Sequence, residues 1–456
     1  MKFLFISKPL FMEPLGIMYL SSTIKKMGHE TDLAITTENL ERKMESFNPD
    51  FVGYSIITGD QDFYSKINKD LKSKFNFFSI AGGPHPTFFP EFLEDSSFDA
   101  ICIGEGEKAI QQFLDKPLSL ETPNFWFKKD REIIAKNPVQ SFISSLDDIP
   151  FPDREIISKC FQIQETPISH FIASRGCPFN CSYCFNEPFS ELYKGKGKRV
   201  RFRTVDNLLE EIKSVVDVHP TKLVYFQDDT FTLNNAWLNE FTEKYPQATK
   251  LPFHCHVRAN TLNEEKVESL RRAGCYSVHF AAETGNDELR NQILNRGMKK
   301  EQIISAAESL RKQGIKYIMQ NMIGIPGGNL ENDLETLELN IACKPDYSWV
   351  SIFQPYPGTK LGELCKEKGY YTGDFKDLDN NFFDSSRLNF SEEYKSQLSH
   401  LQRLFAIFVE YPEVYQLGLL SPMINAPQDE ETKKIYQNAY KEFRKKGDGR
   451  AYGFDL

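Results

Sequence analysis

The sequence predicts an α/β protein with three structural regions. Residues 1 to about 140 alternate short apolar runs with helical patterns, which predicts a doubly wound parallel sheet with helices on both faces. Six further β-type runs lie between about 168 and 370, and a helical pattern follows each of the first five. Six such repeats suit a partial (β/α)6 barrel. The periodic stretches after residue 370 are helical.

The first region contains five candidate strands, with helix-like stretches such as Leu15–Met27 and Phe63–Lys74 between them. The strands are Lys2–Ser7, Thr31–Ile35, Phe51–Ile57, Phe77–Ala81 and Ala100–Ile103. Doubly wound sheets bind their ligands at the carboxyl ends of the strands. Turn residues gather at three of these ends, in Ser55–Gly59, Gly82–Pro86 and Gly104–Gly106, where glycines let the backbone approach a ligand closely.

A connector is expected between the first and second regions. A short surface hairpin, formed by Asn124–Lys128 and Ile133–Ala135, follows the fifth strand. The stretch Leu146–Arg154 then has three carboxylates and two prolines in nine residues. Because prolines favour extended backbone, this stretch is typical of a linker. We therefore predict a first domain over residues 1–140 and a linker over 141–168.

The second region, residues 169–370, is the predicted barrel. Its β-type runs are His170–Ser174, Lys222–Gln227, Phe253–Ala259, Ser277–Ala282, Tyr317–Ile325 and Ser348–Gln354. Two of the helical patterns between them end at Gly274 and Gly314, as expected for a glycine just past the last helical residue. In β/α barrels the chemistry lies at the carboxyl ends of the strands, so the residues that follow these runs are candidates for a site.

The third region, residues 371–456, is predicted to be a helical C-terminal domain. Helical periodicity covers Glu392–Glu410 and Glu430–Lys446, and the region is rich in Tyr and Phe. It contains no motif that identifies a ligand. Substrate identity is expected to be encoded here, where the sequence does not reveal it.

The composition is that of an ordinary globular protein, with 40% hydrophobic and 26% charged residues. A net charge of −9 gives no electrostatic reason to bind nucleic acid or an anionic membrane. No apolar run approaches the roughly 18–20 residues of a membrane span. Only three of the nine cysteines cluster, which indicates a reducing compartment rather than a disulfide framework. We therefore expect a cytoplasmic protein without nucleic-acid or membrane partners.

The strongest chemical signal is the stretch Ser174–Asn186, at the end of the first barrel strand. It contains Cys177, Cys181 and Cys184 in the pattern C-x3-C-x2-C, together with glycine, proline and asparagine residues that permit tight turns. Three thiolates that face one point, without a fourth Cys or His at metal-site spacing, do not complete a structural zinc site. They suit a [4Fe-4S] cluster with one iron left open.

This pattern resembles the signature of the radical S-adenosylmethionine (SAM) superfamily, in which an aromatic residue precedes the last cysteine, as Tyr183 does here. The resemblance implies that the cluster coordinates SAM through its open iron and cleaves it to methionine and a 5′-deoxyadenosyl radical. That radical takes a hydrogen from the substrate. The resemblance also implies a partial barrel, a contact between Tyr183 and SAM, and an external electron donor of the flavodoxin or ferredoxin type.

The same resemblance assigns SAM contacts to the other strand ends of the barrel. Asp228 or Asp229, after the second strand, matches the position that holds the SAM amino group, and a carboxylate is a suitable partner for an ammonium. Glu283, at the end of the fourth strand, matches the acceptor of the ribose hydroxyls. Gly324 and Ile325, at the end of the fifth strand, match the motif whose backbone pairs with the adenine base.

The third barrel strand carries His254, His256 and Arg258. Alternation along a strand places the two histidines on one face. A metal site would need a third ligand, and none is nearby in the sequence, so we expect the histidines to pack in the barrel interior or the active site. Arg258 is expected to face the SAM carboxylate or the substrate. Tyr356, after the sixth strand, could form a wall of the pocket.

The first region resembles the Rossmann-like B12 (cobalamin)-binding domain that precedes the barrel in one large class of radical SAM enzymes. The resemblance covers about 110 residues and implies that the turns at the strand ends contact cobalamin. These candidates are Ser55, Thr58, Gly82, Gly83, Pro84, His85, Gly104, Glu105 and Gly106. The sequence lacks D-x-H-x-x-G, the motif by which some B12 domains supply a histidine to cobalt. We therefore expect no histidine ligand, and His85 is either a turn residue or a contact in the cofactor loop.

Together the two resemblances imply a cobalamin-dependent radical SAM methyltransferase. Such an enzyme transfers a methyl group through methylcobalamin to an unactivated carbon or a phosphorus of a small-molecule or peptide substrate, and a second SAM remethylates the cobalt. One alternative uses the same cofactors for ring closure or rearrangement without methyl transfer. Another is a radical SAM enzyme whose first domain has kept the fold and no longer binds cobalamin.

Two further alternatives fit the sequence less well. A tRNA methylthiotransferase would have three additional N-terminal cysteines, and only Cys102 lies before residue 160. A cobalamin-binding sensor with a structural metal site would not require acids at the ends of several barrel strands.

Overall fold

The computed structural model describes residues 1–158, 167–374, 378 and 382–454. Cys160 lies outside these residues, as do parts of the predicted linker and C-terminal domain. The chain divides into two compact units, and each is described separately. Unit 1 comprises Met1–His170 and Pro188–Asn207, and unit 2 comprises Phe171–Glu187 and Leu208–Leu456.

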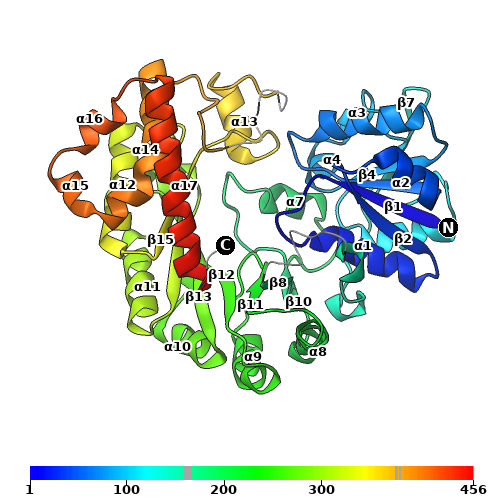
Figure 1. Cartoon of the computed structure of the whole chain (residues 1–456), viewed down its shortest axis with the longest axis horizontal. Helices are drawn as coiled ribbons and strands as arrows, with labels where there is room; N and C mark the ends of the chain where they lie inside the picture. Colours follow the sequence, from blue (N-terminus) through cyan, green and yellow to red (C-terminus); the bar gives the residue numbers. More distant parts are fainter. Residues whose placement is uncertain (159–166, 375–377, 379–381, 455–456) are drawn as a thin grey trace. The chain divides into compact units, whose positions relative to one another are not determined.

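Unit 1 is built on a sheet of seven strands in the order β2-β1-β3-β4-β5-β6-β7 (Figure 1). Its strands are β1 (Lys2–Ser7), β2 (Glu30–Ile35), β3 (Phe51–Ser55), β4 (Phe78–Gly82), β5 (Ala100–Cys102), β6 (Phe125–Lys129) and β7 (Glu132–Lys136). The first five pair in parallel, as the alternating pattern predicts. The order reverses at β1, so the carboxyl ends of β1 and β3 flank the point where a doubly wound sheet takes its ligand.

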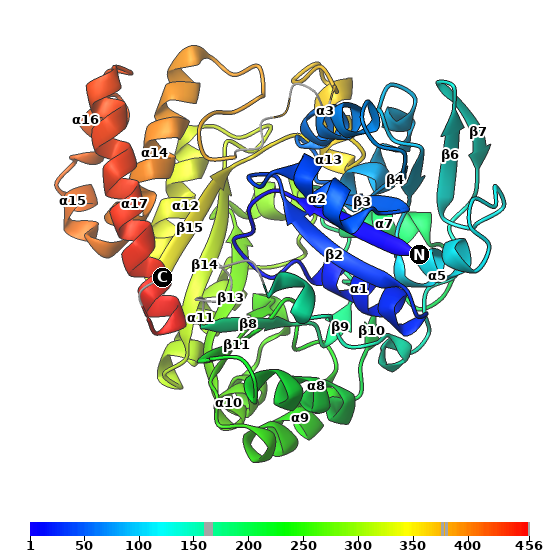
Figure 2. The ribbon, with the colours of Figure 1, turned by 45° about the vertical axis from the view of Figure 1, so that its right-hand side comes forward.

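Apolar residues on both faces of the parallel strands explain why helices cover both sides of this sheet (Figure 2). Leu4 and Ile6 pack with side chains of α2 (Leu40–Phe47) and α3 (Gln61–Lys72). On the opposite face, Phe51 meets Phe113 of α5 at a ring distance of 5.4 Å. Helices α1 (Leu15–Lys26) and α5 (Glu107–Asp115) pack beside one another.

The predicted hairpin is present, and it is part of the sheet rather than a separate surface feature. Strands β6 and β7 pair antiparallel to one another, and β6 also pairs antiparallel to β5. Phe125 and Phe127 of β6 are buried and stack near Phe113. Burial of these rings explains why the hairpin extends the sheet edge.

Unit 2 is built on a sheet of six strands in the order β15-β14-β13-β12-β11-β8. The strands are β8 (Ile168–Phe171), β11 (Leu223–Phe226), β12 (Phe253–Val257), β13 (Cys275–Glu283), β14 (Lys316–Ile323) and β15 (Tyr347–Ile352). Strands β11 to β15 are parallel, and β8 and β15 are the two edges. This arrangement confirms the partial barrel of six β/α repeats.

Helices follow the strands of unit 2 in the predicted alternation. They are α8 (Val205–Val216), α9 (Asn235–Ala248), α10 (Glu264–Ala273), α11 (Lys300–Lys312) and α12 (Leu330–Cys343), with α13 (Lys360–Glu367) after β15. Phe226 of β11 and Phe253 of β12 pack against Phe241 of α9. Because these residues face the helices, the alternating residues of β11 and β12 point to the inner face of the sheet.

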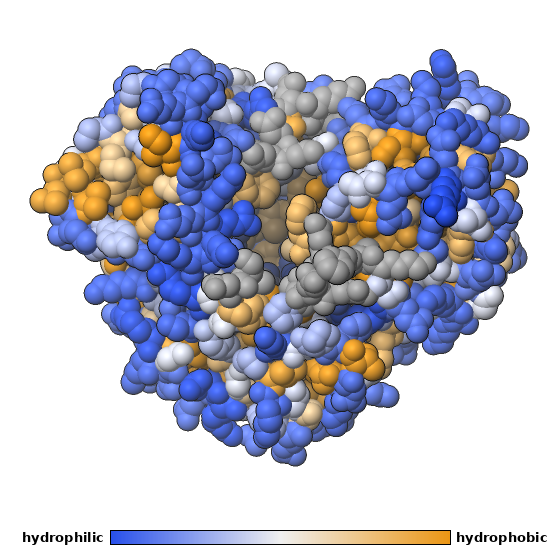
Figure 3. All heavy atoms as spheres, viewed as in Figure 1, coloured by the Kyte–Doolittle hydropathy of each residue, from blue (hydrophilic) through white to orange (hydrophobic). Residues whose placement is uncertain are grey.

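The C-terminal region is helical, as predicted, and packs on β15 and α12. Helix α14 (Glu392–Glu410) contributes Leu398, Leu401 and Phe405 to a core shared with Ile352 of β15. Short helices α15 (Pro412–Gln416) and α16 (Leu420–Ile424) follow, and Figure 3 shows apolar side chains gathered on the surface over them. No helix among the described residues has an apolar stretch long enough to cross a membrane.

The last helix is longer than the sequence predicts. Helix α17 runs over Glu430–Tyr452, six residues past the predicted end at Lys446. Glycines normally end helices, but a Cβ at Gly447 would lie 2.2 Å from the ring of Tyr347. The missing side chain therefore permits close packing of α17 on β15. At the end of this helix, Tyr452 lies 5.9 Å from Tyr225 between ring centroids.

Candidate active site

The three cysteines lie in a turn after β8 in unit 2. The backbone N–H of Cys184 donates to the carbonyl of Cys181 at 3.1 Å, which closes the turn. The loop is anchored through Ser182, whose N–H donates to the carbonyl of Leu294 and whose carbonyl accepts from Leu361. Cys181 is buried, whereas the other two cysteines are partly exposed. The loop is therefore held at its central cysteine, and the two outer cysteines keep some exposure.

Two arginines lie against the sulfur of Cys181. Arg258 Nη1 is 3.5 Å from Cys181 Sγ, and Arg296 Nη1 is 4.0 Å from it. The Arg258 guanidinium also stacks on Phe179 of the same loop, 3.8 Å from the ring centroid. Arg258 was a candidate for the SAM carboxylate or the substrate, and the structure places it beside the cysteines. Two positively charged groups thus lie beside the sulfur of the central cysteine.

Tyr183 connects the cysteine loop to the end of β13. Its hydroxyl donates to Glu283 Oε1 at 2.6 Å, and Arg296 Nη1 donates to the same hydroxyl at 2.9 Å. Arg296 also forms an ion pair with Glu283 at 3.6 Å, with both side chains buried. The predicted SAM contacts Tyr183 and Glu283 are thus brought together, and Arg296, which the sequence did not identify, completes the group.

The backbone at Glu283 adopts an unusual conformation. Its φ is +67°, in the left-handed region that non-glycine residues rarely adopt. The pairing of β13 with β14 shifts register between Ala281 and Glu283. Such strain is found where surrounding contacts hold a side chain in place, here the contacts to Tyr183 and Arg296.

The two aspartates after β11 have different environments. Asp228 is buried and accepts hydrogen bonds from the N–H of Ala173 at 3.0 Å and from the hydroxyl of Ser174. Burial raises the pKa of Asp228 to about 6, against the lowering effect of these hydrogen bonds. Asp229 is exposed and accepts a hydrogen bond from Asn186 at 2.8 Å. Asp229 is therefore the carboxylate that faces outward near the cysteine loop, and Asp228 ties β11 to the end of β8.

Gly324 and Ile325 end β14 in a tightly packed turn. Gly324 has φ +68°, and a Cβ there would lie 2.8 Å from Leu398 of α14. Its N–H donates to Asp333 Oδ1 at 2.9 Å. Ile325 is buried in an apolar cluster whose rim includes Tyr183. Ile325 thus lies in the same cluster as Tyr183, a predicted SAM contact, and Asp333 holds the N–H of Gly324.

The donor set fits an iron–sulfur cluster with an open position. Burial raises the pKa of Cys184 to about 11 and that of Cys177 above its ordinary value, so an arginine or a bound metal is needed to favour the thiolates. Among the described residues, no histidine or carboxylate joins the three sulfurs in a closed metal-binding group. Three sulfur ligands on one loop are the arrangement that leaves one iron free.

In unit 1, His85 is part of the packing beneath the loops. It is fully buried at the start of α4 (Pro84–Phe88), between Phe89 and Phe92. Its Nδ1 is 3.2 Å from the hydroxyl of Thr58, and burial lowers the pKa of His85 to about 4. A neutral, buried imidazole that holds the Thr58 loop fits the role of a turn residue.

The turns after β3 and β4 bring Ser55 and Gly83 together. Gly82, at the end of β4, accepts from the N–H of Ile56, and Gly83 has φ +96°. A Cβ at Gly83 would lie 2.9 Å from Ile56 N and 3.1 Å from Ser55 Oγ. Ser55 and Pro84 are exposed at this edge of the sheet. The two turns thus present backbone and a hydroxyl at the carboxyl ends of adjacent strands.

The turn after β5 is covered by a protein side chain. A Cβ at Gly104 would lie 2.1 Å from the hydroxyl of Tyr193, which also accepts from the N–H of Glu105 at 2.8 Å. The carboxylate of Glu105 forms a bidentate ion pair with Arg201. Gly106 precedes α5 and packs on Leu20. Tyr193 therefore occupies the space that the missing side chain of Gly104 leaves open.

Exposed apolar side chains lie at the same edge of the unit 1 sheet. Phe11 and Met12, in the loop after β1, are 89% and 57% exposed, and Ile57, after β3, is 55% exposed. Exposed apolar side chains that lie together mark a binding surface more often than single exposed apolar residues do. Together with the hydroxyls of Ser55 and Thr58, they suit a large, mostly apolar ligand such as a corrin ring.

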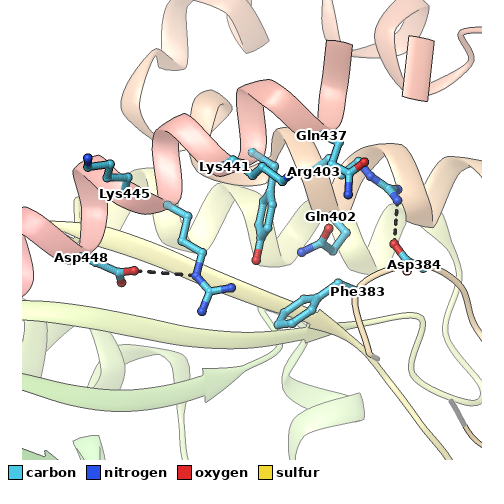
Figure 4. Close-up of a pocket in the computed structure, with 10 residues that line it drawn as sticks. Phe383, Asp384, Gln402, Arg403, Gln437, Lys441, Lys445 and Asp448 are labelled. Carbon is cyan, nitrogen blue, oxygen red and sulfur yellow. Dashed lines mark hydrogen bonds and ion pairs between the residues drawn. The ribbon is translucent and has the colours of Figure 1, made fainter. Parts of the chain in front are cut away.

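A separate cavity of about 350 Å³ lies between α14, α17 and the loop before α14 (Figure 4). Its lining is highly charged, but Arg403 pairs with Asp384 at 2.8 Å and Arg444 pairs with Asp448 at 3.7 Å. None of the residues identified from the sequence lines it. The active site is therefore assigned to the cysteine loop.

Sequence models of two domain families match the chain. The model of the radical SAM superfamily matches residues 171–339, and the model of the B12 binding domain matches residues 1–114. The first match begins six residues before Cys177 and ends after Asp333, so it contains the cysteine loop and the SAM candidates of unit 2. The second contains all the cobalamin candidates of unit 1.

Individual proteins agree with these matches. The uncharacterized methyltransferase PH0819 of Pyrococcus horikoshii is 28% identical over 77% of this chain and 78% of its own. The anaerobic magnesium-protoporphyrin IX monomethyl ester cyclase of Cereibacter sphaeroides is 25% identical over 78% of this chain and 60% of its own. The solved structure of the radical SAM methyltransferase TsrM from Kitasatospora setae, with cobalamin and a [4Fe-4S] cluster bound, has a TM-score of 0.67 at 15% identity and covers 80% of this chain and 75% of that one.

Proposed function

We propose that the chain, which matches the sequence models of the radical SAM superfamily and of the B12 binding domain, is a cobalamin-dependent radical SAM methyltransferase. We propose methyl transfer to an unactivated carbon or a phosphorus of a small-molecule or peptide substrate. The observation that carries this proposal is the contact group around Cys181, in which Arg258 and Arg296 reach the sulfur and Arg296 also reaches Glu283. One compact set of side chains thereby joins the cluster ligands to the predicted SAM contacts.

The proposed roles follow from the environment of each side chain. Cys177, Cys181 and Cys184 would hold a [4Fe-4S] cluster, which supplies the electron for SAM cleavage when bound, as cobalamin supplies the methyl group. Asp229 is exposed beside the cysteine loop, so we propose it as the partner of the SAM ammonium. Asp228, whose carboxylate already accepts from Ala173 and Ser174, positions that loop.

Three other residues would bind the nucleoside part of SAM. Glu283 presents a buried carboxylate, held by Tyr183 and Arg296, that can accept hydrogen bonds from ribose hydroxyls. Asp333 accepts from the N–H of Gly324, and the backbone of Gly324 and Ile325 would pair with the adenine base. Because these groups are held before SAM arrives, little ordering is needed on binding.

For cobalamin, the proposed surface is the carboxyl edge of the unit 1 sheet. Ser55 and Thr58 offer hydroxyls, Pro84 is exposed and Gly83 partly exposed, and Ile57 offers apolar area. His85 is proposed to support this surface from below, because its ring is buried between Phe89 and Phe92. Cobalt would then have no histidine ligand from this domain.

We also propose the cellular setting and the division of the chain. An electron donor of the flavodoxin or ferredoxin type would reduce the cluster, and the protein would act in the cytoplasm without a nucleic-acid partner. We propose a four-part division at residues 1–140, 141–168, 169–370 and 371–456, in which the last part covers the active site and shapes substrate selection. Leu398, which lies against Gly324, and Leu388, which packs in the cluster of Ile325, are contacts of that part with the SAM candidates.

A second function is favoured by similar proteins that are cyclases. The cyclase of Cereibacter sphaeroides is similar over 78% of this chain, so ring closure or another rearrangement with the same cofactors is the alternative. Product mass separates the two functions. Methyl transfer adds one CH2 to the substrate, whereas cyclisation does not.

The experiment that tests the proposal is anaerobic purification with cobalamin supplied, followed by iron, sulfide and cobalt analysis and a SAM cleavage assay. We expect about four irons and one cobalt per chain, with 5′-deoxyadenosine or methylated product formed. Cys181→Ala should lose iron and SAM cleavage and keep cobalt. Cys343→Ala, a buried thiol in α12, is the matched control and should keep all three. Zinc without sulfide in the wild-type protein would reject a radical SAM function, and iron without cobalt would reject the cobalamin assignment.

A further inference from the structure

Three histidines meet on the inner face of the unit 2 sheet, outside the cysteine loop. His254 and His256 are two residues apart on β12, and His279 lies on the adjacent strand β13. In the strand register, His256 is directly opposite His279, and His254 is opposite Ser277. The sequence placed the first two histidines on one face but offered no third ligand nearby. Because β12 pairs with β13, His279 becomes the third candidate ligand, although it lies 23 residues after His256 in the sequence.

The three rings form a compact triangle. Their centroids are 5.9 Å apart for His254 and His256, 6.2 Å for His254 and His279, and 5.4 Å for His256 and His279. One nitrogen from each ring lies within 4.8 Å of the other two. Around a tetrahedral ion with metal–nitrogen bonds of about 2.1 Å, ligand nitrogens are about 3.4 Å apart. Ring rotations that move the nitrogens by about an ångström would therefore bring all three within bonding distance of one ion.

Two of the rings have hydrogen bonds that orient them. His254 Nδ1 is 2.7 Å from the hydroxyl of Ser277, and His256 Nε2 is 3.0 Å from the hydroxyl of Tyr225. Histidine ligands of metals usually have such a partner on one ring nitrogen, while the other nitrogen binds the ion.

His279 lacks a comparable partner. Both of its ring nitrogens are shielded from solvent, and neither has a hydrogen-bond partner within the part of the chain that the structure describes. A buried polar group without a partner is costly and rare in folded proteins. A metal ion at the centre of the triangle would satisfy one of these nitrogens.

We propose that His254, His256 and His279 bind one divalent transition-metal ion, with Zn²⁺ as the representative case. Three imidazoles with a further position left for water or another ligand form a donor set that zinc accepts. His256 lies two residues before Arg258, which directly follows β12, so the site lies about 7 Å from that residue along the extended chain. It is separate from the cysteine loop and does not depend on the proposed methyl transfer.

The test is zinc binding by cluster-replete protein, purified without added zinc and then equilibrated with Zn²⁺ under anaerobic conditions. Elemental analysis should give about one zinc per chain in addition to the cluster iron. X-ray absorption should show a shell of nitrogen or oxygen near 2.0 Å and no sulfur near 2.3 Å, which excludes binding by the cysteines. His279→Leu should lower zinc affinity at least tenfold, as loss of a ligand does.

His219→Leu is the matched control, because His219 lies in the connection between α8 and β11, outside the triangle. It should bind zinc as the wild-type protein does. Iron content and melting temperature show whether each variant is folded. If His279→Leu does not fold, His256→Gln is used in its place. The proposal is overturned if wild-type protein binds no zinc at micromolar concentrations, if the absorption spectrum shows sulfur ligands, or if the folded histidine variants bind zinc unchanged.

Discussion

Tyr183 donates a hydrogen bond of 2.6 Å to Glu283, although 100 residues separate them in the sequence. The bond joins the cysteine loop to the end of β13, and Arg296 strengthens it by contacting both side chains. A hydrogen bond to a carboxylate that is buried and charge-paired contributes more than a neutral surface bond. The position of Glu283 is thus set by the same loop that carries the cluster ligands.

Replacing Tyr183 by phenylalanine tests this connection. Tyr183→Phe removes the donor to Glu283 and leaves the aromatic packing, so iron content should be unchanged. We expect KM for SAM to rise and SAM cleavage at low SAM to fall about tenfold, which corresponds to roughly 1.4 kcal/mol. The measurement is 5′-deoxyadenosine formation against SAM concentration in cluster-replete protein. Tyr370→Phe, on an exposed tyrosine, should leave it unchanged, and equal kinetics in both variants would refute the proposed role.

Gly324→Ala is expected to destabilise the protein more than Gly327→Ala. Both glycines have positive φ, +68° and +85°, so each alanine costs about 1 kcal/mol in backbone strain. Only at Gly324 would the new Cβ meet another side chain, 2.8 Å from Leu398, which adds about 1–3 kcal/mol for overpacking. Thermal unfolding of the two variants measures the difference. Equal melting temperatures would mean that Leu398 moves away freely.

Much of this architecture could be predicted from the sequence, because its signals are local. Strand and helix periodicity, glycines after helices and the spacing of Cys177, Cys181 and Cys184 all lie within short stretches. The alternation predicted two parallel sheets, and the structure and the family matches confirm the α/β fold. The roles of individual site residues stay predictions, although the structure brings Tyr183 and Glu283 into contact.

The parts that could not be predicted depend on contacts between distant segments. Arg296 lies after a π-helix with no periodic signal, and its importance follows only from its contacts with Glu283 and Cys181. Tyr193, which covers Gly104, comes from a segment that folds with unit 1 although it follows the first strand of the barrel. Asp333 resembled an ordinary acid in the first turn of a helix, and only the fold directs it to Gly324.

Ile57→Asp should weaken cobalamin binding without unfolding the protein. Ile57 is 55% exposed, so a charge there costs little in the free protein but would be desolvated against a bound corrin. We expect cobalamin retention after gel filtration to fall about tenfold, from the loss of one buried apolar side chain. Ile134→Asp, at an exposed isoleucine on β7, is the matched control. The same loss in both variants would exclude a specific contact at Ile57.

Asp333 should make the stability of the protein depend on pH. It is buried beneath Gly324 and Tyr394, and burial raises its pKa to about 7, against the lowering effect of hydrogen bonds from both residues. In the unfolded chain this carboxyl ionises near 3.8. Between these values the folded protein therefore binds one more proton than the unfolded chain, and its contribution to stability falls as pH rises from about 4 to about 7.

Asp333→Asn removes this titration and keeps groups that can bond to Gly324 and Tyr394. We expect the melting temperature of the wild-type protein to fall more steeply than that of the variant between pH 5 and 7, with a difference of up to roughly 3 kcal/mol in unfolding free energy. Above pH 7 the two curves should run parallel, because Asp333 is then ionised in both states of the wild-type chain. Parallel curves from pH 5 onward would mean that Asp333 is ionised throughout, with its charge stabilised by the N–H of Gly324 and the hydroxyl of Tyr394.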